Sequence, residues 1–265
     1  MAVTPVTLTK LHGLGNDFLV ALESDGDPDI ARRLCERHTG IGADGLITSR
    51  LLGRGGPRLD FRLWNADGSE APMSGNGMRC VAHAALDAGW VGEDEVFEVD
   101  TPAGVRQVRV QRRGAETTWG SVDMGRVGLG ADEKICNIGR GEMLVDVGNP
   151  HLVILGSDPS QIDVGTLGPA LERSIEGGVN VEFVALGPGT DTVTMRVWER
   201  GVGETQACGT GSVAVAAAVR HWGRVGTAVT VRQPGGSVSV ELHPDGTATL
   251  AGPAERIATC QVDLW

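Results

Sequence analysis

The chain has 265 residues, a formal net charge of −11 and no tyrosine. The acidic excess and the few aromatic residues argue against nucleic-acid binding, which needs clustered positive charge and surfaces on which bases stack. No apolar run approaches the roughly 20 residues of a membrane span, and the N-terminal segment lacks the pattern of a signal peptide. We therefore expect a soluble, cytoplasmic protein with neither membrane nor nucleic-acid partners.

The cysteine and glycine patterns argue against metals and common cofactors. Five widely spaced cysteines are a poor disulfide framework, and the chain contains no CxxC pair and no HExxH motif. It also lacks a P-loop, and no GxGxxG follows a strand. The two lysines do not adjoin a glycine-rich phosphate loop, which disfavours a pyridoxal-phosphate Schiff base. We expect no metal and no cofactor.

The predicted elements come in the same order in each half of the chain. Alternating residues predict a strand over 59–64, and after a glycine-rich loop a helix follows over 78–88, closed by Gly89. The second helix, which Gly223 closes, is apolar on nearly all sides and should be buried. The remaining predicted elements are strands over 95–99 and 105–110, then a strand over 193–198, the second helix over 212–222, and strands over 228–231 and 237–242.

An internal repeat explains this order. Trp64–Gly89 aligns without a gap on Trp198–Gly223, and Ser74 then falls opposite Cys208. Chance similarity between two Gly/Ala-rich stretches is the alternative, but the aligned residues are of several kinds and keep their order. The repeat predicts an α+β fold of two pseudo-symmetric lobes, each a mixed or antiparallel sheet around a central buried helix. The lobes are expected over 1–115 and 116–254, with a cleft between them.

Chemistry is expected where the two helices begin. Cys208 precedes the second helix, whose unpaired N–H groups should lower the thiol pKa below about 8.5. Gly209 and Gly211 would let backbone amides approach an anionic ligand; a buried structural cysteine is the other interpretation. Met73–Gly77 repeats this pattern with Ser74. Two helix starts that face one small substrate across the cleft suit inversion at a carbon, because one group removes the α-proton and the other delivers a proton.

Taken together, the motifs resemble the diaminopimelate epimerase family. They are HGLGNDF, HTGIGADG, NADGSEAPMSGNGMRC, GNPH, LGPALE, VNVEF and ERGVGETQACGTG. The resemblance implies interconversion of LL- and meso-diaminopimelate without cofactor or metal, on the route to lysine and peptidoglycan. It also implies that residues 255–265 return to the first lobe. A homodimer is expected from the frequency of symmetric dimers alone.

The resemblance also implies roles for individual residues. Cys208 is an acid/base thiol, with Ser74 at the usual position of the second cysteine, and His151 and Glu199 tune the pKa of the pair. Arg200 suits the distal carboxylate of the substrate. The substrate-binding set implied by the motifs is Asn16, Asn65, Gly75, Asn76, Asn149, Asn180, Glu199, Arg200, Gly209 and Thr210.

Two residues depart from the family pattern. Ser74 carries a hydroxyl, which does not ionise near neutral pH without a strong base beside it, and Gly45 lacks the polar side chain that some members carry. Ser74 could relay protons poorly, or the chain could be a natural or engineered variant that binds but turns over slowly. It could also be a related amino-acid racemase or lyase that uses Cys208 alone, or a binding protein without catalysis.

Overall fold

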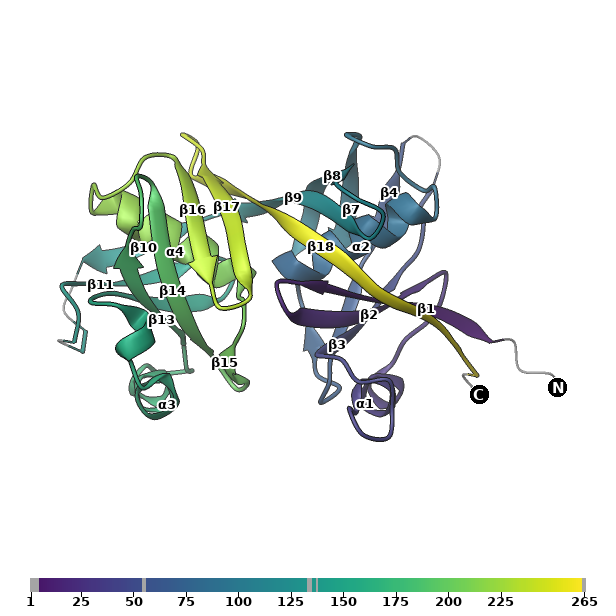
Figure 1. Cartoon of the computed structure of the whole chain (residues 1–265), viewed down its shortest axis with the longest axis horizontal. Coiled ribbons are helices and arrows are strands. Elements are labelled where there is room, and N and C mark those ends of the chain that lie inside the picture. Colours follow the sequence, from purple (N-terminus) through teal and green to yellow (C-terminus); the bar gives the residue numbers. More distant parts are fainter. Residues whose placement is uncertain (1–4, 54–55, 133–134, 137, 264–265) are drawn as a thin grey trace. The chain divides into compact units, whose positions relative to one another are not determined.

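The computed structural model describes residues 5–53, 56–132, 135–136 and 138–263. These residues form two compact units (Figure 1). Unit 1 extends to Val122 and includes the residues from Gly252 onward, and unit 2 is Asp123–Ala251. The ends of the predicted lobe segments, residues 1–4 and 264–265, lie outside the described residues.

Unit 1 is a mixed sheet around the helix α2. From one edge to the other its strands pair in the order β6, β5, β3, β2, β1, β18, β9, β8, β7 and β4, and only the β2–β3 and β4–β7 pairs are parallel. The element bounds are β1 Val6–Gly13, β2 Asn16–Leu22, α1 Pro28–Cys35, β3 Gly45–Ser49, β4 Arg58–Asp60, β5 Arg62–Asn65, β6 Glu70–Ala71, α2 Gly75–Asp87, β7 Val96–Thr101, β8 Gly104–Arg112, β9 Thr117–Arg126 and β18 Thr247–Val262.

Unit 2 repeats this plan around the helix α4. Its strands pair in the order β10, β11, β12, β13, β14, β16, β17 and β18, with β15 paired to β14, and the β12–β13 and β14–β16 pairs are parallel. The element bounds are β10 Gly128–Asp132, β11 Gly141–Asp146, β12 Pro150–Leu155, a short 3-10 helix Pro159–Gln161, α3 Val164–Ser174, β13 Asn180–Leu186, β14 Thr192–Glu199, β15 Gly203–Thr205, α4 Gly209–His221, β16 Ala228–Gln233 and β17 Gly236–Leu242.

The two central helices are buried, α4 with side chains that are small or apolar on nearly every face and α2 with Asn76, Arg79 and His83 buried among such side chains. In α4 the whole run Val213–Val219 is buried, and the helix contacts β11, β12, β13, β16 and β17. In α2 the run Gly75–Ala85 is buried, and the helix contacts β1, β2, β3 and β8. Figure 1 shows α2 among the strands of unit 1. The α+β class, with one buried helix at the centre of each repeat, is confirmed.

Three predicted elements, the two central helices and the strand over 59–64, differ from the observed ones. Both central helices begin three residues earlier than expected, at Gly75 and Gly209, because the glycine-rich segments belong to the first helical turn and not to a loop. The predicted strand over 59–64 is broken at Phe61, where the chain changes partners from β7 to β3. The corresponding strand β14 is continuous and pairs with both β16 and β13.

The ends of the central helices follow the sequence prediction. Gly89 and Gly223 have positive φ angles of 71° and 67° just past the last turns. A residue with a side chain is strained in that left-handed conformation, so glycine is favoured there. Among the described residues, no helix combines the length and apolar character that crossing a membrane requires.

A close contact inside unit 2 gives a test of the fold. A Cβ atom on Gly168 of α3 would lie 2.6 Å from the Cβ of Trp198, whose indole N–H donates to Glu172 Oε2 at 2.7 Å. We expect Gly168→Ala to destabilise the protein by about 1–3 kcal/mol, because the tryptophan must move. Gly165→Ala, in the same helix, meets only Asp163 Oδ1 at 3.6 Å and should gain up to about 1 kcal/mol from helix propensity. Urea denaturation of both variants tests this, and equal midpoints would contradict it.

Candidate active site

The residues before the two central helices have the same local structure. Ser74 and Cys208 are the N-caps of α2 and α4, both with extended backbone at φ −144° and −126°. Ser74 Oγ accepts a hydrogen bond from the N–H of Gly77 at 3.1 Å, and Cys208 Sγ accepts one from the N–H of Gly211 at 3.3 Å. Each side chain therefore satisfies an N–H group that the first helical turn leaves unpaired.

A closed set of hydrogen bonds holds Cys208 in place. Its N–H donates to Gln233 Oε1 at 2.7 Å, and the Gln233 amide donates to Ser212 Oγ at 2.9 Å. The Ser212 hydroxyl donates a hydrogen bond to the carbonyl of Cys208 at 2.7 Å, which closes the set. Sequence reasoning missed Gln233, because the strand that carries it meets α4 only in the folded chain, and it assigned no role to Ser212. The thiol is buried, with 5% of the residue exposed, and lies 3.5 Å from Thr210 Oγ1.

A buried pair of ionisable side chains belongs to the same unit. His151 Nδ1 lies 2.6 Å from Glu182 Oε1, and both residues are completely buried. His151 Nε2 lies 3.0 Å from Asn149 Oδ1. The parallel β12–β13 register sets His151 beside Asn180, and Glu182 follows on the same face two residues later. Sequence reasoning missed Glu182, although the VNVEF motif that it belongs to had been singled out.

The pKa of the Cys208 thiol is raised well above its ordinary value, first by burial and then by the negative charges of Glu199 and Glu182. The expectation of a lowered thiol pKa is therefore wrong for the protein without substrate. The hydrogen bond from the Gly211 N–H and the one with Thr210 favour the thiolate, but they are outweighed. Burial and the charge of Glu182 also raise the pKa of Glu199, whose carboxylate accepts a hydrogen bond from the Thr205 hydroxyl.

Asn180 and Arg200 are brought together beside this group. The Asn180 amide donates to the carbonyl of Pro150 at 3.0 Å, and its oxygen accepts from the N–H of Arg200 at 2.9 Å. The exposed Arg200 guanidinium donates to the carbonyl of Gly177 at 2.9 Å. Arg200 is thus held by backbone carbonyls and forms no ion pair among the described residues.

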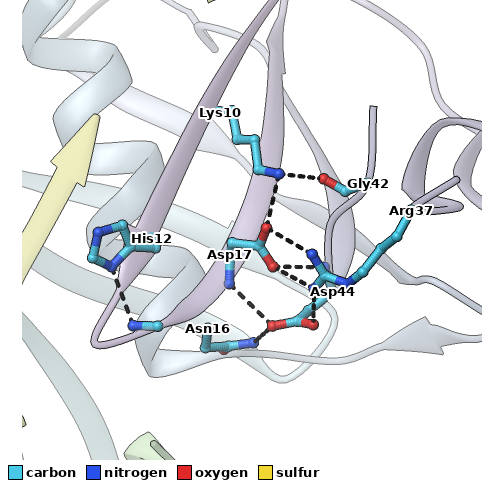
Figure 2. Close-up of polar contacts among 8 residues, drawn as sticks. Lys10, His12, Asn16, Asp17, Arg37, Gly42 and Asp44 are labelled. Atoms are coloured by element: carbon cyan, nitrogen blue, oxygen red, sulfur yellow. Dashed lines mark hydrogen bonds and ion pairs between the residues drawn. The ribbon is translucent and has the colours of Figure 1, made fainter. Parts of the chain in front are cut away.

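Unit 1 brings together a second set of predicted residues. Asn76, in the first turn of α2, donates to Asn16 Oδ1 at 3.1 Å. Asn16 in turn donates to Asp44 Oδ2 at 2.8 Å, a bond that Figure 2 shows. Asn65 is not joined to this pair by a hydrogen bond in the described structure. Its amide donates to Ser69 Oγ at 3.0 Å within the turn between β5 and β6.

Gly45 lies opposite Asn65 in the β3–β5 pair, where a side chain has no room. A Cβ atom at Gly45 would lie 2.8 Å from the carbonyl oxygen of Trp64 and 2.9 Å from Leu63 Cδ1. Gly45 therefore offers only its backbone at the position where some family members carry a polar side chain.

The surroundings of the two helix starts differ in polarity. The β2–β3 pair of unit 1 corresponds to the β12–β13 pair of unit 2, with Gly45 at the position of Asn180. Two residues farther along the strand, Ile47 therefore occupies the position that Glu182 has in unit 2. A Cβ atom on Gly77 would lie 3.0 Å from Ile47 Cδ1, whereas one on Gly211 would lie 2.8 Å from Glu182 Oε1. Within its own unit, the start of α2 packs on an aliphatic side chain and the start of α4 packs on a carboxylate. Nowhere in the described part of the chain do three or more His, Cys, Asp or Glu side chains gather in a way that could hold a metal ion.

Comparison with known proteins assigns the chain to a family. The sequence profile of the family described as "Diaminopimelate epimerase" matches residues 8–129 and 143–257. The chain is 40% identical to the diaminopimelate epimerase of Desulforudis audaxviator, covering 94% of this chain and 96% of that protein. It is 38% identical to that of Moorella thermoacetica, with the same shares covered. The structure of a predicted epimerase from Pseudomonas aeruginosa has the same fold, with a TM-score of 0.76 at 17% identity over 99% of this chain and all of that one. The chain belongs to the diaminopimelate epimerase family.

Proposed function

We propose that this chain is an isomerase that interconverts LL- and meso-diaminopimelate by proton transfer at the α-carbon, without a cofactor. The observation that carries the proposal is the placement of Cys208. It is a buried thiol at the start of a buried helix, hydrogen-bonded to the Gly211 N–H and close to two carboxylates. Such a group can exchange a proton with a substrate carbon, and the helix N–H groups can stabilise the negative charge that develops on the substrate.

The proton balance assigns a role to each side of the α-carbon. In one direction the Cys208 thiolate takes the α-proton and becomes a thiol. The electron pair of the C–H bond stays on the α-carbon and delocalises into the adjacent substrate carboxylate. A group on the opposite face then donates a proton to the carbon. In the reverse direction the Cys208 thiol donates. The raised pKa of Cys208 favours the thiol at neutral pH. The protein without substrate therefore holds Cys208 in the protonation state that donates a proton to the α-carbon.

We place Ser74 on the opposite face, and this requires both helix starts to reach one substrate in a cleft shared by the lobes. Backbone N–H groups of Gly75, Asn76, Gly209 and Thr210 would bind the substrate carboxylate. Asn16, Asn65, Asn149, Asn180 and Glu199 would bind its polar groups, and Arg200 would bind the distal carboxylate. His151 and Glu199 would tune the proton affinity of the acid/base groups. We further propose a cytoplasmic location, where the precursor is made, and a homodimer.

A second candidate function follows from the serine itself. A hydroxyl is a far weaker acid than a thiol, and the side chain that packs under the Gly77 turn is aliphatic. A racemase or lyase that uses Cys208 alone would need no acid at Ser74. Loss of water from 3-hydroxyproline or from β-substituted amino acids would favour this candidate, whereas meso product from LL-diaminopimelate would favour the epimerase. Ligand binding without either reaction would indicate a binding protein.

Restoring a thiol at Ser74 tests the two-sided mechanism. We expect Ser74→Cys to raise the rate of LL-diaminopimelate epimerisation by about 100-fold or more, because a positioned acid/base group contributes that much. The assay follows meso product and α-deuterium in heavy water. Ser74→Ala is the control and should not gain. If Ser74→Cys gains nothing on diaminopimelate, the pocket serves another substrate.

The charge of Glu199 gives a prediction about pH. Because this carboxylate raises the thiol pKa of Cys208, Glu199→Gln should lower that pKa and give roughly tenfold more Cys208 thiolate at a given alkaline pH. Ultraviolet thiolate absorbance measured across pH, with the signal of Cys208→Ser subtracted, reports the titration. Glu204→Gln removes an exposed carboxylate paired with Arg196 and should leave the Cys208 titration unchanged. If the Cys208 thiol of Glu199→Gln titrates at the same pH as in the unchanged chain, or at a higher pH, this charge effect is ruled out.

A further inference from the structure

Four side chains of unit 1 form one continuous line of hydrogen bonds. Arg79 Nη2 donates to Asn76 Oδ1 at 3.0 Å, Asn76 Nδ2 donates to Asn16 Oδ1 at 3.1 Å, and Asn16 Nδ2 donates to Asp44 Oδ2 at 2.8 Å. Asn76 and Asn16 are amides of the proposed substrate-binding set. Arg79 and Asp44 had no role in the sequence prediction.

The charged ends determine which way both amides point. A guanidinium only donates hydrogen bonds and a carboxylate only accepts them, whereas a carboxamide has one accepting oxygen and one donating nitrogen. If Asn76 were flipped, its NH2 group would face the Arg79 donor and its oxygen would face the oxygen of Asn16. A flipped Asn16 would likewise direct its oxygen at the Asp44 carboxylate. Only one orientation of each amide satisfies all three bonds.

The Asp44 end is anchored by a cluster of charges (Figure 2). Its Oδ2 also accepts from the N–H of Asp17 at 3.0 Å, and its Oδ1 accepts from Arg37 Nη2 at 2.7 Å. The same Arg37 nitrogen donates to Asp17 Oδ1 at 2.8 Å, and Lys10 Nζ lies 3.0 Å from Asp17 Oδ2. Asp44 is therefore fixed by a backbone N–H and a shared guanidinium.

The Arg79 end is fixed by the shape of the core. The side chain is completely buried, and its Nε donates to the carbonyl of Pro253 at 3.2 Å. A Cβ atom on Gly13 would lie 2.8 Å from Arg79 Nη2, and one on Gly120 would lie 3.0 Å from Arg79 Cγ. Two glycines on different strands thus leave the space that the side chain fills. Burial lowers the pKa of Arg79 to about 10, so it remains a cation and a donor at neutral pH.

The repeat shows that packing alone does not require these charges. The residues of unit 2 that correspond to Arg79 and Asp44 are Val213 and Val179, both completely buried. A buried guanidinium is costly unless its hydrogen bonds are made, and no described carboxylate forms an ion pair with Arg79. A core that needed only to be filled could use valine, as it does in the other unit.

We propose that Arg79 and Asp44 are positioning residues for the proposed epimerisation. They act through Asn76 and Asn16, whose amide oxygens and nitrogens they fix in place at the helix start that carries Ser74, before a substrate arrives. Preorganised polar groups bind better because no ordering cost remains at the moment of binding. The proposal rests on the proposed function for its catalytic consequence, but the orientation of the amides can be tested independently of activity.

Hydrogen exchange of side-chain amides in the full chain, labelled with ¹⁵N-asparagine, tests the orientation. The Asn16 and Asn76 signals are identified by their loss in Asn16→Asp and Asn76→Asp. In the unchanged chain both NH2 groups should exchange slowly. Arg79→Met and Asp44→Asn should each accelerate exchange at both asparagines by about tenfold, since losing a buried or partly buried hydrogen bond costs enough for that factor. Arg79→Lys keeps the cation and should restore part of the protection.

Kinetics on diaminopimelate test the consequence. Asp44→Asn should lower kcat/KM by about tenfold or more, mainly through KM. Both oxygens of Asp44 accept hydrogen bonds, so the NH2 group of the asparagine must face a donor, either Asn16 and the Asp17 N–H or Arg37. Asp100→Asn, which removes a surface partner of Arg58, is the matched control and should leave exchange and kinetics unchanged.

Unchanged amide exchange in Arg79→Met and Asp44→Asn would overturn the proposal. So would faster exchange with unaltered KM, because the line of hydrogen bonds would then serve the fold alone. If the unchanged chain does not turn over diaminopimelate, the proposed function fails separately. Calorimetric affinity for diaminopimelate then replaces KM in the same comparison, and equal affinities would overturn the proposal.

Discussion

A buried helix leaves the N–H groups of its first turn without partners, and this constraint shapes both halves of the molecule. The chain meets it at α2 and α4 with an N-cap side chain and with glycines that let the first turn pack against a strand. The hydrogen bond that stabilises the helix start therefore also holds the oxygen of Ser74 and the sulfur of Cys208 in place. The fold and the proposed chemistry depend on the same unpaired donors.

The two copies of this arrangement differ in what lies beneath them. Under α4 the chain places Glu182, which is paired with His151, and it leaves Cys208 with a raised pKa. Under α2 it places Ile47, and the charged residues lie farther along the helix, at Arg79, and just before β3, at Asp44. One helix start thus has ionisable neighbours beside Cys208, the proposed acid/base group. The other has a line of oriented amides suited to holding a ligand still.

The sequence predicted the features that depend on local pattern and on the repeat. The two central helices, their glycine ends at Gly89 and Gly223, and the α+β class all follow from periodicity and from the alignment of Trp64–Gly89 with Trp198–Gly223. It did not predict that the glycine-rich segments open the helices, because glycine has low helix propensity and only tertiary packing explains its presence there. The break at Phe61 was missed because it is set by a change of strand partner.

The candidate site was predictable to a similar extent. Cys208, Ser74 and the asparagines stood out from their motifs. The partners of Cys208, His151 and Asn16, which are Gln233, Glu182 and Asp44, did not stand out, since strand pairing and contacts between distant segments bring them together. The direction of the Cys208 pKa was wrong because a sequence shows the helix dipole but not the burial or the two carboxylates that outweigh it.

The pairing of β1 with β18 has a consequence for how the protein is made. Val6 pairs with Val262, so the sheet of unit 1 includes strands from near both ends of the described chain, whereas unit 2 is the continuous segment Asp123–Ala251. A ribosome completes unit 2 before it reaches the end of β18. The sheet of the unit that is synthesised first is therefore completed last, and until β18 arrives the edges of β1 and β9 that it will occupy have no strand partner there.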